Sequence, residues 1–183
     1  MTEVGLAQAQ ALAARLAGDR VDRLVSSDLG RARQTAEPIV HRTGLAIELD
    51  PALRERNYGI FEGRTYGEIE RENPDAFALL TRRDPTYAIP GGESGEAFSA
   101  RVLRALERIA GAHAGRRIAV VTHGGVLGVL YRHATRVSPD SRRDYSLANA
   151  SVNHVWYGAG SWVIEHWGDV AHLPQGAADD PVD

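Results

Sequence analysis

The stretch that decides the fold is Ile118-Ala119-Val120-Val121-Thr122-His123-Gly124-Gly125. Its first four residues form a continuous apolar run, which is typical of a strand buried on both faces of a parallel sheet. Helical spacing of apolar residues follows directly, through Val126 and Leu130. We therefore expect Thr122 and His123 where a central strand gives way to a helix, the place at which α/β sheets gather functional residues.

Strand and helix signals alternate on both sides of this stretch. Apolar residues at three- and four-residue steps predict helices, and short apolar runs between them predict strands. We expect helices over residues 6–16, 31–43, 66–80 (with a break near Pro74) and 97–113, and strands over residues 21–26 and 118–121. Residues 151–157 and 161–167 predict a hairpin. This alternation predicts an α/β three-layer sandwich with a mainly parallel central sheet.

The composition is that of an ordinary globular domain. Of the 183 residues, 43% are hydrophobic and 25% are charged, so one compact domain is expected rather than a disordered chain. The net charge of -3 gives no global basic field for nucleic acid or an anionic membrane. The absence of cysteine excludes disulfides, thiolate nucleophiles and cysteine zinc sites. With neither a signal sequence nor a long apolar run, we expect a cytoplasmic protein without a membrane partner.

Three side chains are candidates for chemistry, and each has a structural alternative. His123 precedes a helix start whose N–H groups and dipole favour phosphate, but it can also be a hydrogen-bonded core histidine. Arg31 begins a helix, where a guanidinium can fork onto phosphate oxygens or lie on a solvated helix face. Glu55 lies between two arginines in a glycine-bounded loop. It can give a proton to a leaving alkoxide or form a surface salt bridge.

Four segments, taken in order, resemble the histidine phosphatase superfamily, also called the phosphoglycerate mutase-like family. Residues 26–36 resemble its Ser-Ser-x-Leu-x-Arg-Ala-x-Gln-Thr-Ala segment, and residues 53–63 its Leu-x-Glu-x-x-x-Gly-x-x-Glu-Gly segment. Pro90-Gly91-Gly92-Glu93-Ser94 matches a loop near the family's substrate, and residues 120–125 match its second-histidine segment. The resemblance extends to about Leu173, so it covers nearly the whole chain.

The resemblance implies a role for each candidate residue. It implies that Arg31 and Gly124 bind phosphate, and that His123, as imidazolium, stabilises the transferring phosphoryl group. It also implies that Glu55 is the proton donor. The substrate loop would contain Gly92, Glu93 and Ser94. It implies no cofactor and no metal; the expected partner is a small phosphorylated metabolite, and a homodimer is the assembly that such relatives suggest.

The sequence departs from the family at its start. The family's Arg-His-Gly signature, whose histidine attacks phosphorus, does not occur here, and residues 1–9 resemble the helix that normally follows it. We therefore expect the complete protein to carry that signature upstream of Met1, on a central strand whose absence exposes strand edges. Residues 1–173 are then expected to form an N-terminally incomplete domain, followed by a flexible acidic tail over residues 174–183.

The resemblance implies phosphomonoester hydrolysis through a phosphohistidine in the complete protein. Mutase-type phosphoryl transfer is the alternative, although the short chain between Glu55 and His123 favours a phosphatase. A non-catalytic phospho-ligand-binding remnant would fit a chain without the nucleophile. Nucleic-acid binding is not favoured, because Arg101, Arg104 and Arg108 indicate a solvated helix face.

Overall fold

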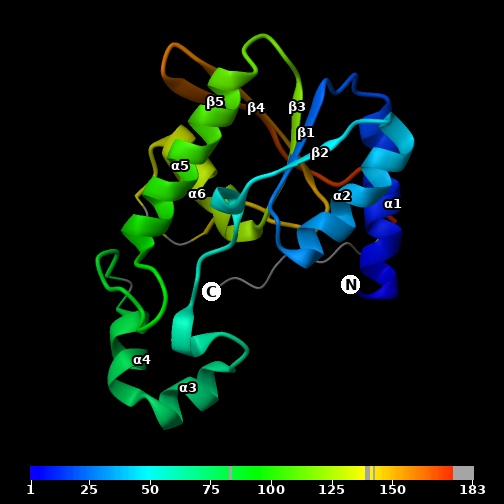
Figure 1. Ribbon diagram of the computed structural model, residues 1–183. Coiled ribbons are helices and arrows are strands. Elements are labelled where there is room, and N and C mark those ends of the chain that lie inside the picture. Colours follow the sequence, from blue (N-terminus) through cyan, green and yellow to red (C-terminus); the bar gives the residue numbers. More distant parts are fainter. Residues whose placement is uncertain (83, 139–140, 142, 175–183) are drawn as a thin grey trace.

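A parallel three-stranded sheet lies at the centre of the computed structural model, which describes residues 1–82, 84–138, 141 and 143–174 (Figure 1). Its strands are β1 (Arg23–Ser26), β2 (Ile47–Leu49) and β3 (Ile118–Val121), in the order β2-β1-β3. Ser26 is in register with Leu49 of β2 and Val121 of β3. The carboxyl ends of β1 and β3 therefore meet at the same edge of the sheet.

The helices follow the periodicity of the sequence closely. They are α1 (Glu3–Ala17), α2 (Gly30–Thr43), α3 (Tyr66–Glu72), α4 (Pro74–Thr81), α5 (Gly95–Ala112) and α6 (Gly124–Thr135), with short 3-10 helices η1 (Pro51–Leu53) and η2 (Gly59–Phe61). The predicted break near Pro74 is confirmed, because this proline occupies the first turn of α4, where its missing N–H needs no partner.

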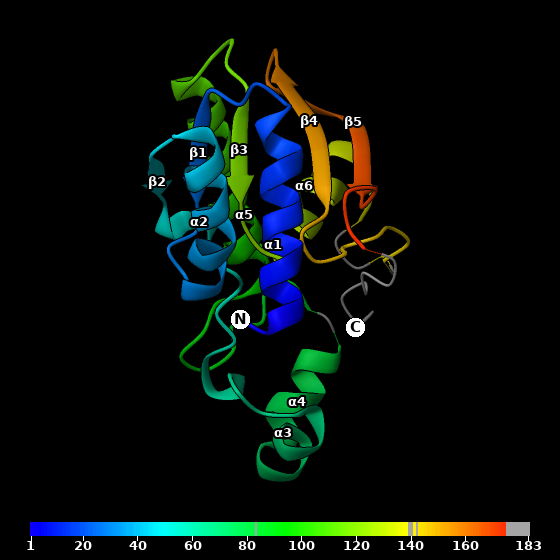
Figure 2. The same ribbon diagram turned by 90° about the vertical axis from the view of Figure 1, so that its right-hand side faces the viewer.

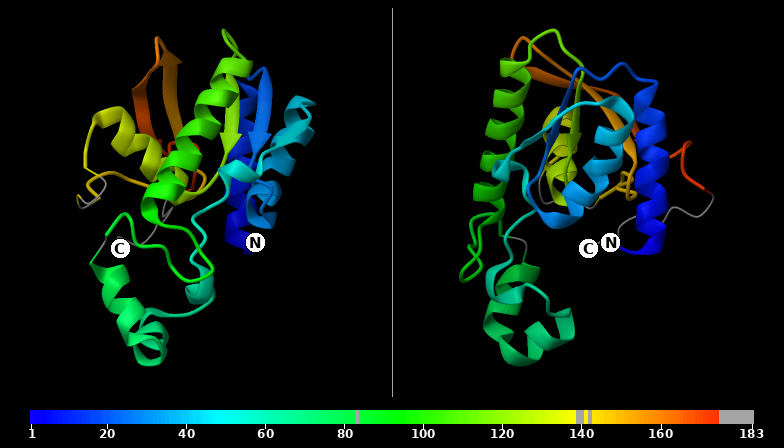
Figure 3. Two further views of the ribbon diagram at one scale, coloured as in Figure 1. Left: turned by 60° about the vertical axis from the view of Figure 1, so that its left-hand side comes forward. Right: turned by 45° about the vertical axis from the view of Figure 1, so that its right-hand side comes forward.

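Two helical layers cover the sheet. Leu24 shares a core cluster with residues of α1 and α2, whereas the next residue, Val25, shares one with residues of α5 and α6. This change of face from one residue to the next is the two-residue period of a strand buried on both sides. Figures 2 and 3 show α1 and α2 on one face of the sheet and α5 and α6 on the other. The predicted three-layer α/β sandwich is confirmed.

The predicted hairpin is also confirmed, as the antiparallel pair β4 (Val152–Gly158) and β5 (Ser161–Asp169). In the described part of the chain, β4 pairs with β5 but not with β3. The apolar residues Ile118, Ala119 and Val120 of β3 are half-buried rather than fully buried as expected. This difference follows from the unpaired edge of β3, which no described strand covers.

A second, smaller apolar cluster lies outside the sandwich. Phe61, Ile69 and Ile89 are buried together among the residues that precede α5, and Figure 1 shows α3 and α4 extending away from the sheet. No helix in the described ranges is long and apolar enough to span a membrane. Of the predicted acidic tail, residues 175–183 lie outside the described residues.

Candidate functional site

The ends of β1 and β3 bring Ser27 and His123 into contact. The two residues are 96 positions apart in the chain, and Ser27 Oγ lies 2.8 Å from His123 Nε2. Both are buried, with exposed fractions of 0% for Ser27 and 7% for His123. His123 is thus hydrogen-bonded in the core, as its structural alternative required, and it also stands at the strand end where catalytic residues gather.

The surroundings of His123 oppose its protonation. Burial lowers its pKa most, and the positive charges of Arg31 and Arg101 lower it further, to about 4, against the opposing effect of Asp28. Without a bound anion the imidazole is therefore expected to be neutral near pH 7, and its role as an imidazolium beside a phosphoryl group stays a prediction. Protonation near pH 7 requires an additional negative charge beside the ring, and a phosphate dianion is a group that would supply it.

Glu55 lies at the beginning of α6. Its Oε2 accepts the N–H of Gly125 at 2.8 Å and its Oε1 accepts the N–H of Arg56 at 2.8 Å. A Cβ added to Gly125 would lie 2.0 Å from Glu55 Oε1, so only glycine permits this approach. The N–H of Gly124, in the first turn of the same helix, has no intrahelical acceptor. The predicted proton donor and the predicted phosphate-binding helix start therefore adjoin each other.

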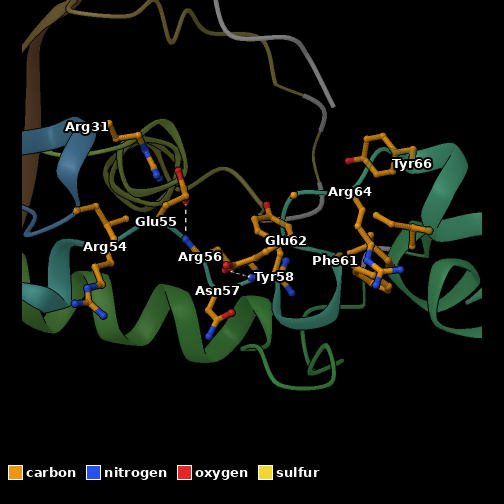
Figure 4. A pocket seen from close by; sticks show the side chains of 14 residues that line it. Arg31, Arg54, Glu55, Arg56, Asn57, Tyr58, Phe61, Glu62, Arg64 and Tyr66 are labelled. Atoms are coloured by element: carbon orange, nitrogen blue, oxygen red, sulfur yellow. Dashed lines mark hydrogen bonds between the residues drawn. The ribbon is translucent and has the colours of Figure 1, made fainter. Parts of the chain in front are cut away.

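Arg31 contributes an unpaired positive charge to the site. It is exposed in the first turn of α2, and Figure 4 shows its side chain and that of Glu55 directed toward one another. Within the described residues, its guanidinium forms no hydrogen bond or ion pair. Asp28, which precedes the N-cap residue Leu29, does not cap this helix and accepts from Arg54 Nε at 2.7 Å. That bond is the main cause of the lowered pKa of Asp28.

A pocket of about 720 Å³ extends from Arg31 and Glu55 toward α3 (Figure 4). Its volume falls within the range of small-molecule sites. Tyr58 and Tyr66 also line it, with exposed fractions of 36% and 56%. His123 and Gly124 are not among its lining residues. No group of three metal-ligating side chains occurs among the described residues.

The predicted substrate loop contacts the Glu55 segment. A Cβ on Gly92 would lie 2.5 Å from the carbonyl oxygen of Asn57, so this loop packs closely on that segment. Glu93 accepts the N–H of Asn57 at 3.0 Å, and Ser94 caps α5 by accepting the N–H of Ala97 at 3.1 Å. None of the three loop residues lines the pocket of about 720 Å³, although Gly92 and Glu93 line a smaller neighbouring pocket together with Glu55, and their contact with substrate stays a prediction.

Sequence reasoning missed two residues of this site. Ser27, the partner of His123, was given no role, although it lies in the Ser-Ser pair of the matched segment 26–36 and directly after the predicted strand. The assignment of Arg101 to a solvated helix face is wrong: its side chain is 25% exposed and pairs with Glu93. A signal was present, because Arg101 lies three residues after the buried Phe98, at the edge of the apolar face of α5.

Comparisons with known proteins show which family and which fold the chain shares. A family model described as the histidine phosphatase superfamily (branch 1) matches residues 1–170. Phosphoglycerate mutase-like protein 4 of Arabidopsis thaliana is 38% identical over 179 residues, covering 96% of this chain and 76% of the relative. The metal-independent phosphoserine phosphatase of the same species is 39% identical over 176 residues, covering 94% of this chain and 72% of the relative.

Solved structures match as well. Bacillus stearothermophilus YhfR superposes with a TM-score of 0.86 at 31% identity, covering 95% of this chain and 87% of that protein. The alpha-ribazole phosphatase from Shigella flexneri gives a TM-score of 0.82 at 25% identity, covering 94% of this chain and 84% of that protein.

Proposed function

Because this chain belongs to the histidine phosphatase superfamily, branch 1, we propose that it hydrolyses phosphate monoesters of small metabolites. The observation that carries the proposal is the position of Glu55, whose Oε2 accepts the N–H of Gly125 at the start of α6. A carboxyl group there lies beside the N–H groups and dipole that favour a phosphate, and it lines a pocket together with the unpaired Arg31. The predicted acid, Glu55, and the predicted phosphate-binding Arg31 thus line the same pocket.

The mechanism follows from the roles that the family suggests. The histidine of an Arg-His-Gly segment, which we assign to the complete protein, attacks phosphorus, so that an N–P bond forms as the ester P–O bond breaks. Glu55 gives its proton to the leaving oxygen, and Arg31, the N–H of Gly124 and protonated His123 stabilise the phosphoryl oxygens. Water then attacks phosphorus, Glu55 accepts its proton, and the N–P bond breaks to release phosphate.

The charges of the pocket favour hydrolysis over mutase-type transfer. A mutase must hold a bisphosphorylated intermediate, which calls for cations beyond those on one phosphate. Two further arginines that line the pocket are already paired, Arg54 with Asp28 and Arg64 with Glu72. Arg56 donates to the carbonyl oxygen of Glu93 at 3.1 Å. Among the described lining residues, two guanidinium groups form no ion pair: that of Arg56, which is held on the Glu93 carbonyl oxygen, and that of Arg31, which is not held by any such bond.

The test compares two arginines of α2. Arg31→Gln should weaken binding of inorganic phosphate, measured by calorimetry, and lower phosphomonoester turnover by about 10²–10³-fold, because charge stabilisation is usually the largest catalytic contribution. Arg33→Gln is the matched control, since Arg33 is equally exposed two residues later on the same helix. The proposal fails if both variants bind and react alike. Phosphate binding without turnover in a protein that carries the Arg-His-Gly segment would favour the non-catalytic alternative.

A further inference from the structure

The backbone that carries Glu55 lies between two short helices. The helix η1 ends at Leu53 and η2 begins at Gly59, and the residues between them belong to no helix or strand. A carboxyl group on irregular backbone transfers a proton efficiently only if other contacts hold that backbone in place. The contacts of this segment therefore bear directly on the chemistry proposed for Glu55.

Arg101 of α5 binds the segment on the amino-terminal side of the Glu55 side chain. Its Nη1 donates to the carbonyl oxygens of Ala52 at 2.9 Å and Arg54 at 3.1 Å, and its Nη2 donates to that of Glu55 at 3.4 Å. Three carbonyl groups that no regular structure satisfies are thus bound by one planar guanidinium. A lysine ammonium does not have this rigid fork of donors.

Glu93 binds the same segment on the other side of Glu55. Its Oε1 accepts the N–H of Asn57 at 3.0 Å, its own N–H donates to the carbonyl oxygen of Asn57 at 3.0 Å, and its carbonyl oxygen accepts Arg56 Nε at 3.2 Å. Glu93 also forms an ion pair with Arg101 in which both side chains are largely buried, 19% and 25% exposed. The backbone of Glu55 is therefore held by Arg101 through the residues before it and by Glu93 through the residues after it.

We infer that the Glu93–Arg101 ion pair is a positioning device that holds Glu55 against the start of α6 for proton transfer. That Glu55 transfers a proton rests on the proposed function. That the ion pair holds Glu55 in place, the geometric half of the inference, does not depend on it. Neither residue touches the reacting atoms in this scheme. Each acts through the backbone on either side of Glu55, and the two residues depend on one another because a single ion pair joins them.

The geometric half is tested by NMR on the full chain. The amide protons of Gly125 and Arg56 donate to the Glu55 carboxylate, so they report its position. In Arg101→Gln, exchange of both amides should rise by about tenfold, as it should in the reference variant Glu55→Gln. Arg104→Gln, which removes the same charge one turn away at an exposed position, should leave both amides unchanged. Unchanged amides in Arg101→Gln would overturn the inference.

The functional half is tested by the leaving group. Loss of a positioned acid should slow hydrolysis of an alkyl phosphate by about 10²-fold and barely affect p-nitrophenyl phosphate, whose leaving group needs little protonation. We expect this pattern in Arg101→Gln and Glu93→Gln. A smaller loss is expected in Arg101→Lys, which protects the test against a glutamine variant that fails to fold. Equal losses on both substrates would overturn the positioning role.

Two controls separate loss of Glu55 positioning from a changed charge near His123 and from failure of the proposed function. Glu93→Gln keeps the positive charge of Arg101, so its effect does not arise from the influence of that charge on His123. Turnover is measured in the protein that carries the Arg-His-Gly segment assigned above, and if that protein turns over neither substrate, the proposed function fails. The amide measurements still decide whether Glu93 and Arg101 hold Glu55 in place.

Discussion

The imidazole of His123 lies among groups that keep it neutral. It is buried against Ser27, it is near the positive charges of Arg31 and Arg101, and these surroundings lower its pKa to about 4. The ring differs in this respect from a histidine exposed to water, for which the pKa is 6.5. Under the proposed function, in which His123 is protonated beside the phosphate, phosphate binding should be accompanied by proton uptake.

The lowered pKa makes the stability of the protein depend on pH. Between pH 6.5 and about 4 the unfolded chain binds a proton at His123 that the folded chain does not. The free energy of unfolding should therefore fall as the pH falls through this window, by up to about 1.4 kcal/mol per pH unit, with no contribution from this residue above it. Urea unfolding of the unmodified chain and of His123→Gln at several pH values measures this contribution. If the free energies of unfolding of the two proteins change with pH in parallel between pH 6.5 and about 4, the lowered pKa of His123 is refuted.

At the level of secondary structure, the first turn of α6 must both continue the helix and leave room for the Glu55 carboxylate. Gly125 presents its N–H to Glu55, and its missing side chain leaves room for that carboxylate. Alanine is the better helix former by up to about 1 kcal/mol. Glycine at this position therefore lowers the stability of the helix but allows the Glu55 carboxylate to approach its N–H closely.

Gly125→Ala should separate stability from activity. We expect an unchanged or slightly higher melting temperature, because the helix gains propensity, and a turnover of alkyl phosphates at least about tenfold lower, because Glu55 is displaced. Gly30→Ala in the first turn of α2 is the control, since an added Cβ there meets nothing within 4 Å. If Gly125→Ala retains full turnover, the carboxylate of Glu55 does not need this position.

At the level of the whole molecule, the apolar interior is divided. The sandwich contains the two large clusters on either side of the sheet, whereas the cluster around Ile69 lies apart, beneath α3 and α4. These two helices also support the far wall of the pocket, to which Tyr66 and Ile69 belong. A region with its own small core can open without unfolding the remainder of the protein.

Hydrogen exchange tests this division. Ile69→Ala removes a side chain that is only 3% exposed and should cost about 2–5 kcal/mol within its cluster. Amides of α3 and α4 should then exchange faster, while those of β1 and β3 change little. Val102→Ala, in the large cluster on α5, should instead accelerate exchange throughout the molecule. Equal acceleration of all amides in Ile69→Ala would show a single cooperative unit.

The sequence by itself determined the elements and the edge of the sheet at which the site lies. Apolar spacing is a local property, so it predicted the helices, the break at Pro74, the hairpin and the strand that ends before His123, although not the partial exposure of that strand. The motifs around Arg31 and Glu55 predicted the family, which the match over residues 1–170 confirmed. Each of these signals lies within a few residues of the feature it describes.

The tertiary structure alone decided which side chains meet. The bond between Ser27 and His123 spans 96 residues, that between Glu55 and Gly125 spans 70, and that between Glu55 and Arg101 spans 46. Periodicity records which face of an element is buried, but not which distant residue covers it. The pKa of His123 and the burial of Arg101 depend on those distant neighbours, because desolvation and charge act through space rather than along the chain.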